Sequence, residues 1–333
     1  MNFELDEDTI LLRDSVRELG KQKADDVAGW ESARALPEAW LSELGEMGLL
    51  AMRVPEDDGG AGLSTLASLA VIEELGAFSA STAFTVAVHN LLGLGLGATA
   101  PASGVLGFAR GFVATPSGDG VSLSGTDPAA FGSSTGSVVA LATLDGAPVP
   151  TLVTAEGSRS RTLGLRAADI GALTLEGAAA TKLGGDVDQA LTDFRLALGF
   201  IAAGVARAAL RVGTEYALER QQFGKPIAKF QAIQWKLADL ATGLDSAELM
   251  LGVAAGRSDE GRDAAAARAT LAAVQAATTG CSDMLQVHGG YGYTEEYAIE
   301  RLYRDAKALA LYAGVRAEAR TTVADGIVQR FGA

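Results

Sequence analysis

The segment CSDMLQVHGGYGYTEEYAIERLYRDAKALALYAG, residues 281–314, decides how the whole chain is interpreted. Its first third has the apolar spacing of a helix, and this pattern breaks at Gly289 and Gly290. An aromatic turn with Tyr291 and Tyr293 follows, after which a charged helix runs into residues 304–307. Two adjacent glycines at a helix end expose backbone N–H groups and leave room for a ligand. The segment therefore predicts two helices joined by a turn that can lie against a ligand.

Composition limits the class of protein. The 333 residues, 48% hydrophobic and 20% charged, are ordinary for a soluble globular chain of two or three domains. A net charge of −14 argues against a nucleic-acid partner, because binding phosphates requires a basic face. The acidic N-terminus does not look like a signal peptide, and the apolar run 196–206, bounded by Arg195 and Arg207, is too short to cross a bilayer. We therefore expect a cytoplasmic protein without membrane insertion.

The few cysteine and histidine residues suggest little chemistry of their own. The single cysteine, Cys281, excludes a disulfide framework, and in a helix without a basic neighbour we expect it to be a buried thiol. His89 and His288 lack the spacing of metal ligands, so we expect no metal site. We expect His288, beside Gly289, to contribute packing and backbone rather than acid–base chemistry.

Helical and β-prone patterns alternate along the chain and predict an α+β fold that is mostly α. Residues 1–108 show apolar helical faces and a turn cluster at 55–62, which predict an N-terminal α-domain. Residues 109–187 are richer in glycine, serine and threonine and contain short β-prone runs, which predict a small, reduced middle β-domain. Residues 188–333 predict a C-terminal α-helical bundle that begins with one long helix.

The glycine-rich segment GLGLGATA, residues 93–100, invites comparison with a dinucleotide-binding fingerprint. It follows a helical pattern instead of a strand, and no acidic residue stands at the distance that such a site requires. We interpret the segment as a helix or a loop.

Three segments in the right order resemble the flavin-dependent acyl-CoA dehydrogenase family. They are QVHGGYGYTEEYAIERLYRDAK at 286–307, RQQFGKPIAKFQ at 220–231, and the GLL, VPE, GGAG and Ser sequence within 48–64. The resemblance implies the family's fold, with an N-terminal helical domain, a β-domain and a C-terminal bundle. It also implies FAD as cofactor, an acyl-CoA as substrate and an electron-transfer flavoprotein as electron acceptor.

The same resemblance implies which residues contact FAD. In the family, the segment around the Arg and Phe-Gly-Lys-Pro residues reaches across a subunit interface to the flavin of the neighbour, where a guanidinium can fork onto the pyrophosphate and an amide can hydrogen-bond the nucleotide. The cofactor-binding residues implied here are Arg220, Gln222, Phe223, Phe230, Gln231, Gln286, Val287, Gly289 and Gly290. The competing interpretation is that Arg220 caps a helix end and that the phenylalanines belong to the core.

The family's catalytic base is absent from this sequence. Dehydrogenation needs a carboxylate that removes the α-proton while hydride leaves the β-carbon for the flavin. In one branch the base follows the Arg-Asp-Ala-Lys motif, where this chain has Ala313. In a second branch it lies on the long helix, where this chain has Phe194. The Thr-Glu-Pro motif of the family's middle domain is also absent. We therefore assign no catalytic residue.

Nearby carboxylates are poor substitutes for the missing base. Asp193, Asp305 and Glu318 lie near the two base positions in sequence, but a displacement of one to five residues turns a side chain to another face of its helix. Arg195 falls where some members use an arginine to contact coenzyme A, which makes it a weak substrate-binding candidate. The alternative is a surface arginine paired with Asp193.

The catalytic base and the middle-domain motif are lost, but the residues that would contact the flavin of a neighbouring subunit are retained. We therefore expect a short, non-catalytic subunit of a heterotetrameric acyl-CoA dehydrogenase, in which a full-length catalytic subunit supplies the base and FAD is shared across the interface. By analogy with split enzymes of the family, the substrate would be a steroid side-chain CoA thioester. Two alternatives stay open: a self-sufficient homo-oligomeric dehydrogenase with a relocated base, and an acyl-CoA-binding scaffold that has lost flavin.

Overall fold

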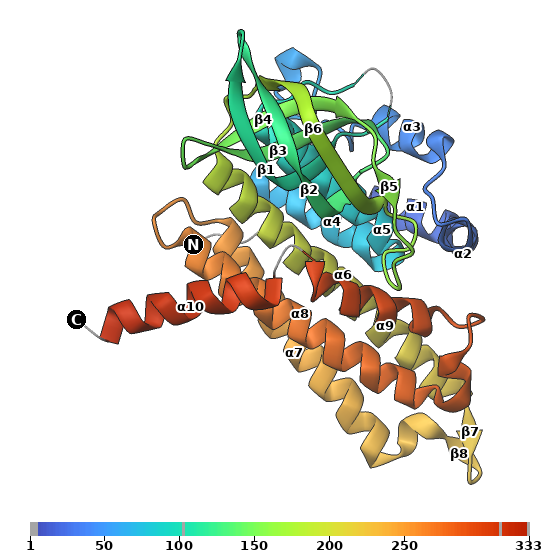
Figure 1. Ribbon diagram of the computed structural model, residues 1–333. Coiled ribbons are helices and arrows are strands. Elements are labelled where there is room, and N and C mark those ends of the chain that lie inside the picture. The colour runs from blue at the N-terminus through green and yellow to red at the C-terminus, as the bar shows by residue number, and fades with distance from the viewer. Residues whose placement is uncertain (1–5, 102–103, 313–314, 332–333) are drawn as a thin grey trace.

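The computed structural model describes residues 6–101, 104–312 and 315–331. Figure 1 shows a twisted sheet stacked over one end of a long helical bundle, with the first helices packed beside the sheet. The described N-terminal elements are α1 (Glu7–Gln22), α2 (Ala24–Ala33), α3 (Glu38–Glu46), η1 (Glu56–Asp58), α4 (Thr65–Phe78), α5 (Ala80–Ala87), η2 (Val88–Gly93) and η3 (Leu94–Leu96). Residues 93–96 are helical, so the prediction of a helix or loop there is confirmed.

Serine side chains start the two buried helices of this region. Ser64 and Ser79 each accept a hydrogen bond from a backbone N–H three residues ahead, at 3.2 Å in both cases, which satisfies one of the free donors of a helix start. Helix α4 is buried on nearly every side, as expected for a helix without a polar face. It forms the centre of the α-domain.

The middle segment closes on itself as a small barrel-like sheet. Its strands are β1 (Gly107–Ser117), β2 (Gly120–Phe131), β3 (Gly136–Leu144), β4 (Ala147–Ala155), β5 (Ser158–Arg159) and β6 (Ile170–Lys182). The strand order is β2-β1-β3-β4-β6-β5, and β2 also pairs with β6, so the main strands have neighbours on both sides. Among the described strands, only β1 and β3 pair in parallel. The sheet encloses its own apolar core, including Leu123, Val138 and Leu173, which confirms the expected small β-domain.

The C-terminal bundle is built around one 33-residue helix. Its elements are α6 (Val187–Glu219), β7 (Gln221–Gln222), β8 (Lys225–Pro226), η4 (Ile227–Lys229), α7 (Gln231–Ala255), α8 (Arg262–Val287), η5 (Gly289–Tyr293), α9 (Ala298–Leu309) and α10 (Val315–Phe331). The hairpin β7–β8 lies at the end of the bundle farthest from the sheet (Figure 1). The expected fold, with helical, β and helical regions in that order, is confirmed.

Helix α6 is the core helix of the molecule. A Cβ added at Gly204 would approach the carbonyl oxygen of Glu73 to 2.2 Å, so glycine is needed for the close crossing of α4 and α6. The expected long helix is confirmed, and it continues through both Arg195 and Arg207, the charges that bound the apolar run 196–206. By length and composition alone α6 could cross a membrane, but 78% of its most apolar 18-residue window is buried inside the fold. We therefore interpret it as a core helix.

Candidate functional site

Aromatic rings pack around Phe194, which occupies one of the two positions expected for the catalytic base. Phe194 on α6 is buried, and its ring centroid lies 5.9 Å from that of Phe84 and 6.0 Å from that of Phe131. Tyr312 packs against the same two rings, at 6.0 Å and 6.2 Å. Ala313 follows Tyr312 in the chain but lies outside the described residues. We name Phe84, Phe108, Phe131, Phe194 and Tyr312 the aromatic cluster.

Little space remains beside the aromatic cluster. The hollow there has a volume of about 60 Å³. Its lining consists of Phe108, Arg110, Phe131, Leu191, Phe194, Arg195, Leu198 and Glu318. Arg110 and Glu318 form an ion pair at 3.3 Å that joins β1 to α10 beside it. Pockets that hold organic ligands usually measure roughly 300–1,000 Å³. Within the described part of the chain, this hollow cannot take a flavin ring and an acyl thioester.

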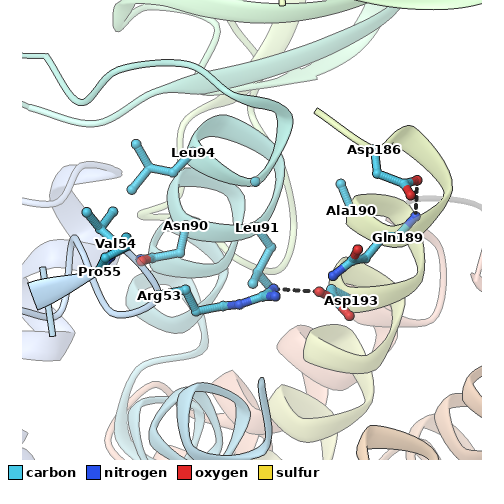
Figure 2. Close-up of a pocket in the computed structure, with 11 residues that line it drawn as sticks. Arg53, Val54, Pro55, Asn90, Leu91, Leu94, Asp186, Gln189, Ala190 and Asp193 are labelled. Carbon is cyan, nitrogen blue, oxygen red and sulfur yellow. Dashed lines mark hydrogen bonds and ion pairs between the residues drawn. The ribbon is translucent and has the colours of Figure 1, made fainter. Parts of the chain in front are cut away.

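The nearby carboxylates are already engaged. Asp193 is buried, and its two oxygens each accept from a guanidinium at 2.5 Å, Arg53 on one side and Arg262 on the other. The pairing expected between Asp193 and Arg195 was therefore wrong, and Arg195 pairs with Asp263 instead. Figure 2 shows Arg53 reaching toward Asp193 across a separate hollow of about 290 Å³.

Asp305 is likewise unsuited to act as a free base. It is fully buried, and its Oδ1 accepts from the backbone N–H of Leu165 at 2.7 Å. Burial, together with the nearby Glu31, raises the pKa of Asp305 to about 7. Its Oδ2 has no hydrogen-bond partner, which fits a carboxyl group that keeps its proton. The residue holds the loop before β6 against α9.

A second, larger hollow of about 490 Å³ lies at the far end of the bundle, where α6 and α8 end. Five of the expected cofactor-binding residues line it: Arg220, Gln222, Val287, Gly289 and Gly290. The fold thus brings together two sequence segments that are more than 60 residues apart. We call this hollow the nucleotide-end hollow. It is wide open to the surface, as a site completed by another chain would be.

Aromatic residues form the wall of the nucleotide-end hollow. Tyr216 stacks on His288 with ring centroids 4.3 Å apart, and Tyr297 packs edge-on against Tyr216 at 5.8 Å. The Arg220 guanidinium lies 5.9 Å from the centroid of Tyr291. Sequence reasoning did not assign a role to Tyr216 or Tyr291, although the aromatic turn at residue 291 was a signal.

His288 acts as a packing residue, as expected. Its Nδ1 lies 2.7 Å from the carbonyl oxygen of Met284, and the ring is buried between Tyr216 and Tyr297. Burial lowers the pKa of His288, so the imidazole is neutral near pH 7. Cys281 is also fully buried, and burial raises its pKa far above the ordinary value, which confirms the expected inert thiol.

The two glycines beside His288 leave their backbone open. Gly289 has a φ of +59°, a left-handed conformation that suits glycine. A Cβ added at Gly289 or Gly290 would meet no atom of this chain within 4 Å. Packing within the chain therefore does not require a glycine at 290. The free space lies where a ligand or a second chain can approach the backbone.

The β7–β8 hairpin carries a strained, exposed aromatic side chain. Phe223 and Gly224 occupy a two-residue turn with φ values of +51° and +76°. The turn between β3 and β4 has nearly the same pair of angles, +51° and +84°, but is built from the favoured sequence Asp145–Gly146. Phenylalanine in this left-handed conformation costs about 1–2 kcal/mol. Strain that packing does not offset indicates a contact outside the chain.

The remaining expected residues surround this hairpin. Phe223 is 93% exposed, so the competing interpretation that places it in the core was wrong. Its ring lies 6.2 Å from that of Phe230, and Lys225 Nζ lies 4.4 Å from the Phe230 centroid. Gln231 begins α7 and Gln286 lies near the end of α8; both are exposed and neither lines the nucleotide-end hollow. Among the described residues, no group of three or more His, Cys, Asp or Glu could hold a metal ion.

Comparisons with known proteins identify the family of this chain. Residues 6–99 match the family model "Acyl-CoA dehydrogenase, N-terminal domain", and residues 185–328 match "Acyl-CoA dehydrogenase, C-terminal domain". The chain is similar to the mitochondrial short-chain specific acyl-CoA dehydrogenase of Bos taurus, with 32% identity over 380 residues, covering 99% of this chain and 92% of the relative. Because this chain has only 333 residues, the bovine relative carries internal segments that this chain lacks.

Two solved structures extend the likeness to three dimensions. A chain solved in work on the electron transferring flavoprotein of Acidaminococcus fermentans and flavin-based electron bifurcation has 25% identity and a TM-score of 0.91, covering 99% of this chain and all of that chain. A glutaryl-CoA dehydrogenase of Mycobacterium smegmatis in complex with FADH2 has the same fold, with 20% identity and a TM-score of 0.87, covering 98% and 95% of the two chains. Because two family models together match most of its length and relatives align along nearly all of it, the chain belongs to the acyl-CoA dehydrogenase family.

Proposed function

We propose that this chain is a non-catalytic subunit of an FAD-dependent acyl-CoA dehydrogenase, and that it completes the FAD site of a full-length catalytic partner. The observation that carries the proposal is the aromatic cluster, which leaves a hollow of only about 60 Å³ beside Phe194. In such a complex the partner supplies the base, most of the flavin site and the pocket for the acyl-CoA. This chain alone would then be inactive.

The missing base and the filled site both support a non-catalytic role for this chain. Proton abstraction requires a carboxylate in contact with the substrate, and small displacements of that carboxylate cost much of the rate. The two expected positions hold Ala313 and Phe194, while Asp193 is held between two arginines. A relocated base in a self-sufficient enzyme would still lack space for the substrate. This argues against the homo-oligomeric alternative.

The nucleotide-end hollow supports the second half of the proposal. When bound, FAD would supply the hydride-accepting chemistry, and this chain would contact only its nucleotide end. Arg220 offers a guanidinium suited to a pyrophosphate, Gly289 and Gly290 offer open backbone, and Phe223 offers an exposed ring. A scaffold without flavin would have no use for this combination, particularly for a strained phenylalanine.

Exposed apolar side chains near the hollow provide a surface for the partner. Phe223, Tyr293 and Trp235 are 93%, 89% and 62% exposed, respectively, and all three lie on the α6–α9 bundle or its hairpin. Phe223 and Tyr293 are the sequence neighbours of Gln222 and Thr294, which line the hollow, and large exposed aromatic residues indicate a protein interface. The proposed assembly is a heterotetramer of two short and two catalytic subunits, with one FAD per pair of unlike subunits.

Substrate, electron acceptor and location complete the proposal. The substrate class is an acyl-CoA thioester, and the filled site in this subunit would suit a bulky acyl group, such as a steroid side chain, in the partner. An electron-transfer flavoprotein is the proposed electron acceptor, supported by the likeness to the Acidaminococcus fermentans chain. A cytoplasmic location is part of the proposal, because the single cysteine suits a reducing compartment.

The test is an absorption spectrum combined with the native mass. The chain is expressed alone and then together with a full-length member of the family encoded beside it. We expect a colourless chain alone and a yellow, stable mixed oligomer. A yellow chain that an acyl-CoA bleaches in the absence of a partner would overturn the proposal. A mixed oligomer without flavin would favour the scaffold instead.

A further inference from the structure

A groove far from both sites described above runs between four helices. It is bounded by α1, α4, α6 and α9, with the first residue of α2 at one end, and it encloses about 660 Å³. This volume falls in the range of roughly 300–1,000 Å³ that is typical of small-molecule sites. No residue of the aromatic cluster or of the nucleotide-end hollow contributes to its lining.

Small and apolar side chains keep the floor of this groove open. The floor consists of Gly20, Ala24, Ala77, Phe78, Ala208, Val212, Ala298 and Leu302. A Cβ at Gly20 would come within 2.6 Å of the Phe78 ring, so glycine allows that ring to lie against α1. Four alanines from four different helices then leave a channel that larger side chains would fill. The floor is suited to an alkyl chain.

The rim of the groove is cationic in a chain whose net charge is −14. Its lining contains five cationic residues, Arg17, Lys21, Arg207, Arg211 and Arg301. It contains two carboxylates, Glu74 and Glu215. Four of these cations are paired within the chain: Arg17 with Glu74, Lys21 with Glu18, Arg207 with Glu73, and Arg211 with Glu215. Among the described residues, Arg301 is the lining cation that has no ion pair.

Arg301 is the cation best placed to hold a ligand. Among the described residues it has no carboxylate within ion-pair distance, although its field reaches the buried Asp305 one turn further along α9. Its Nη1 donates to the carbonyl oxygen of Phe78 at 3.0 Å, which fixes the guanidinium at the end of α4. An arginine has five N–H donors, so most remain available for a planar, two-oxygen acceptor.

We propose that this groove binds an amphipathic carboxylate, such as a medium- or long-chain fatty acid, with the carboxylate on Arg301 and the alkyl chain along the alanine floor. The match is one of charge and polarity together, because an apolar floor that ends at a fixed guanidinium complements a single anion on an apolar tail. The proposal does not depend on the proposed subunit role, since none of its residues belongs to that site.

The probe is sodium dodecanoate below its micelle concentration, titrated into the purified chain by isothermal titration calorimetry. We expect one saturable site per chain, and we expect dodecanol, which lacks the charge, to bind at least about tenfold more weakly. In Arg301→Gln the affinity for dodecanoate should fall by about tenfold and the preference over dodecanol should disappear. Arg268→Gln is the matched control, because Arg268 is exposed on α8 and does not line the groove.

A filling variant tests the floor independently of the charge. Ala298 begins α9 and is exposed, so Ala298→Trp would place its ring in the groove without disturbing the core. We expect this variant to lose dodecanoate binding, whereas Ala238→Trp, at an exposed position on α7, should retain it. Circular dichroism would check that each variant is folded.

Several results would overturn the proposal. They are the absence of saturable binding by the unmodified chain, equal affinity for dodecanol and dodecanoate, and unchanged binding in Ala298→Trp. Binding to vesicles of phosphatidylglycerol without binding of monomeric dodecanoate would also overturn it, because the groove would then recognise a membrane surface. The wild-type comparison of acid and alcohol stands even if Arg301→Gln fails to fold.

Discussion

Tyr312 packs edge-on against Phe131, with ring centroids 6.2 Å apart and ring planes at 88°. The next residue in the sequence is Ala313, where the family resemblance places a catalytic glutamate. Phe194, at the other base position of the family, packs against the same Phe131 ring at 6.0 Å. Under the proposed function, this packed aromatic cluster takes the place of an acid–base site, so that loss of the base and closure of the pocket are two parts of one change.

Restoring a carboxylate should therefore not restore activity. In Phe194→Glu the new carboxyl would lie among aromatic rings, and the two arginines of the adjacent hollow, Arg110 and Arg195, are already paired with Glu318 and Asp263. We expect the free energy of unfolding to fall by about 3–5 kcal/mol and no dehydrogenase activity to appear in the chain alone. Denaturant titration and an acyl-CoA bleaching assay measure the two quantities. Phe194→Leu is the control and should cost less than about 3 kcal/mol. A stable Phe194→Glu protein that oxidises acyl-CoA would contradict the account.

Arg220→Ala should separate a cofactor role from a structural one. The Arg220 side chain is exposed, and its recorded contact is with the Tyr291 ring at 5.9 Å, so its loss should change the stability of the chain by less than about 1 kcal/mol. In the mixed oligomer, flavin retention should weaken by about tenfold or more. Arg211→Ala, on the same helix and in an exposed ion pair, is the control. Equal flavin content in the two variants would count against a nucleotide contact.

Phe223→Asn tests whether the strained backbone at residue 223 serves a contact of the phenylalanine ring outside this chain. Asparagine tolerates the left-handed conformation, so the isolated chain should become more stable by about 1 kcal/mol. Flavin retention by the mixed oligomer should decrease, because the exposed ring is lost. The reciprocal change, Asp145→Phe, puts the same strain into the turn between β3 and β4 and should lower stability without affecting flavin. If Phe223→Asn left both stability and flavin retention unchanged, the assignment of Phe223 would be wrong.

How far the sequence predicted this structure depends on the kind of contact. Helical periodicity predicted one long helix at the start of the C-terminal bundle, which is α6, because periodicity is a local property of the sequence. The aromatic cluster could not be predicted, since its rings come from α5, β1, β2, α6 and the residue before Ala313, and their meeting depends on the tertiary fold. The resemblance identified missing groups at residues 194 and 313 but not the packing that replaced them.

The ion-pair partners of Asp193 and Arg195 also could not be predicted from neighbouring residues in the sequence. Asp193 and Arg195 are two residues apart, which suggested a pair, but side chains two apart on a helix do not face each other. Each residue forms ion pairs with other segments instead: Asp193 pairs with Arg53 and Arg262, and Arg195 pairs with Asp263. The strained turn at Phe223 likewise became visible only when its φ could be compared with that of Asp145.

His89 should make stability fall in mild acid. Its Nε2 lies 2.8 Å from the Leu50 carbonyl oxygen and its Nδ1 accepts from the Leu106 N–H at 2.9 Å, so the ring is buried in its neutral form. Burial lowers its pKa from 6.5 to about 4. Below pH 6.5 the unfolded state takes up a proton that the folded state refuses, so this residue alone should remove about 2 kcal/mol between pH 7 and pH 5.

The measurement is a denaturant titration at both pH values, on the wild type and on His89→Asn. Asparagine does not titrate, so the variant should be less stable at pH 7 but should lose about 2 kcal/mol less on acidification. Parallel losses in the two proteins would show that His89 is not the source of the acid sensitivity.

The central claim is that this chain completes a flavin site that belongs to its partner. Native mass spectrometry of the mixed oligomer, combined with the flavin content after denaturation, tests the claim most directly. The account predicts one FAD for each pair of unlike subunits, because the aromatic cluster leaves this chain no site of its own. Two FAD molecules per pair, or FAD bound by this chain alone, would contradict it.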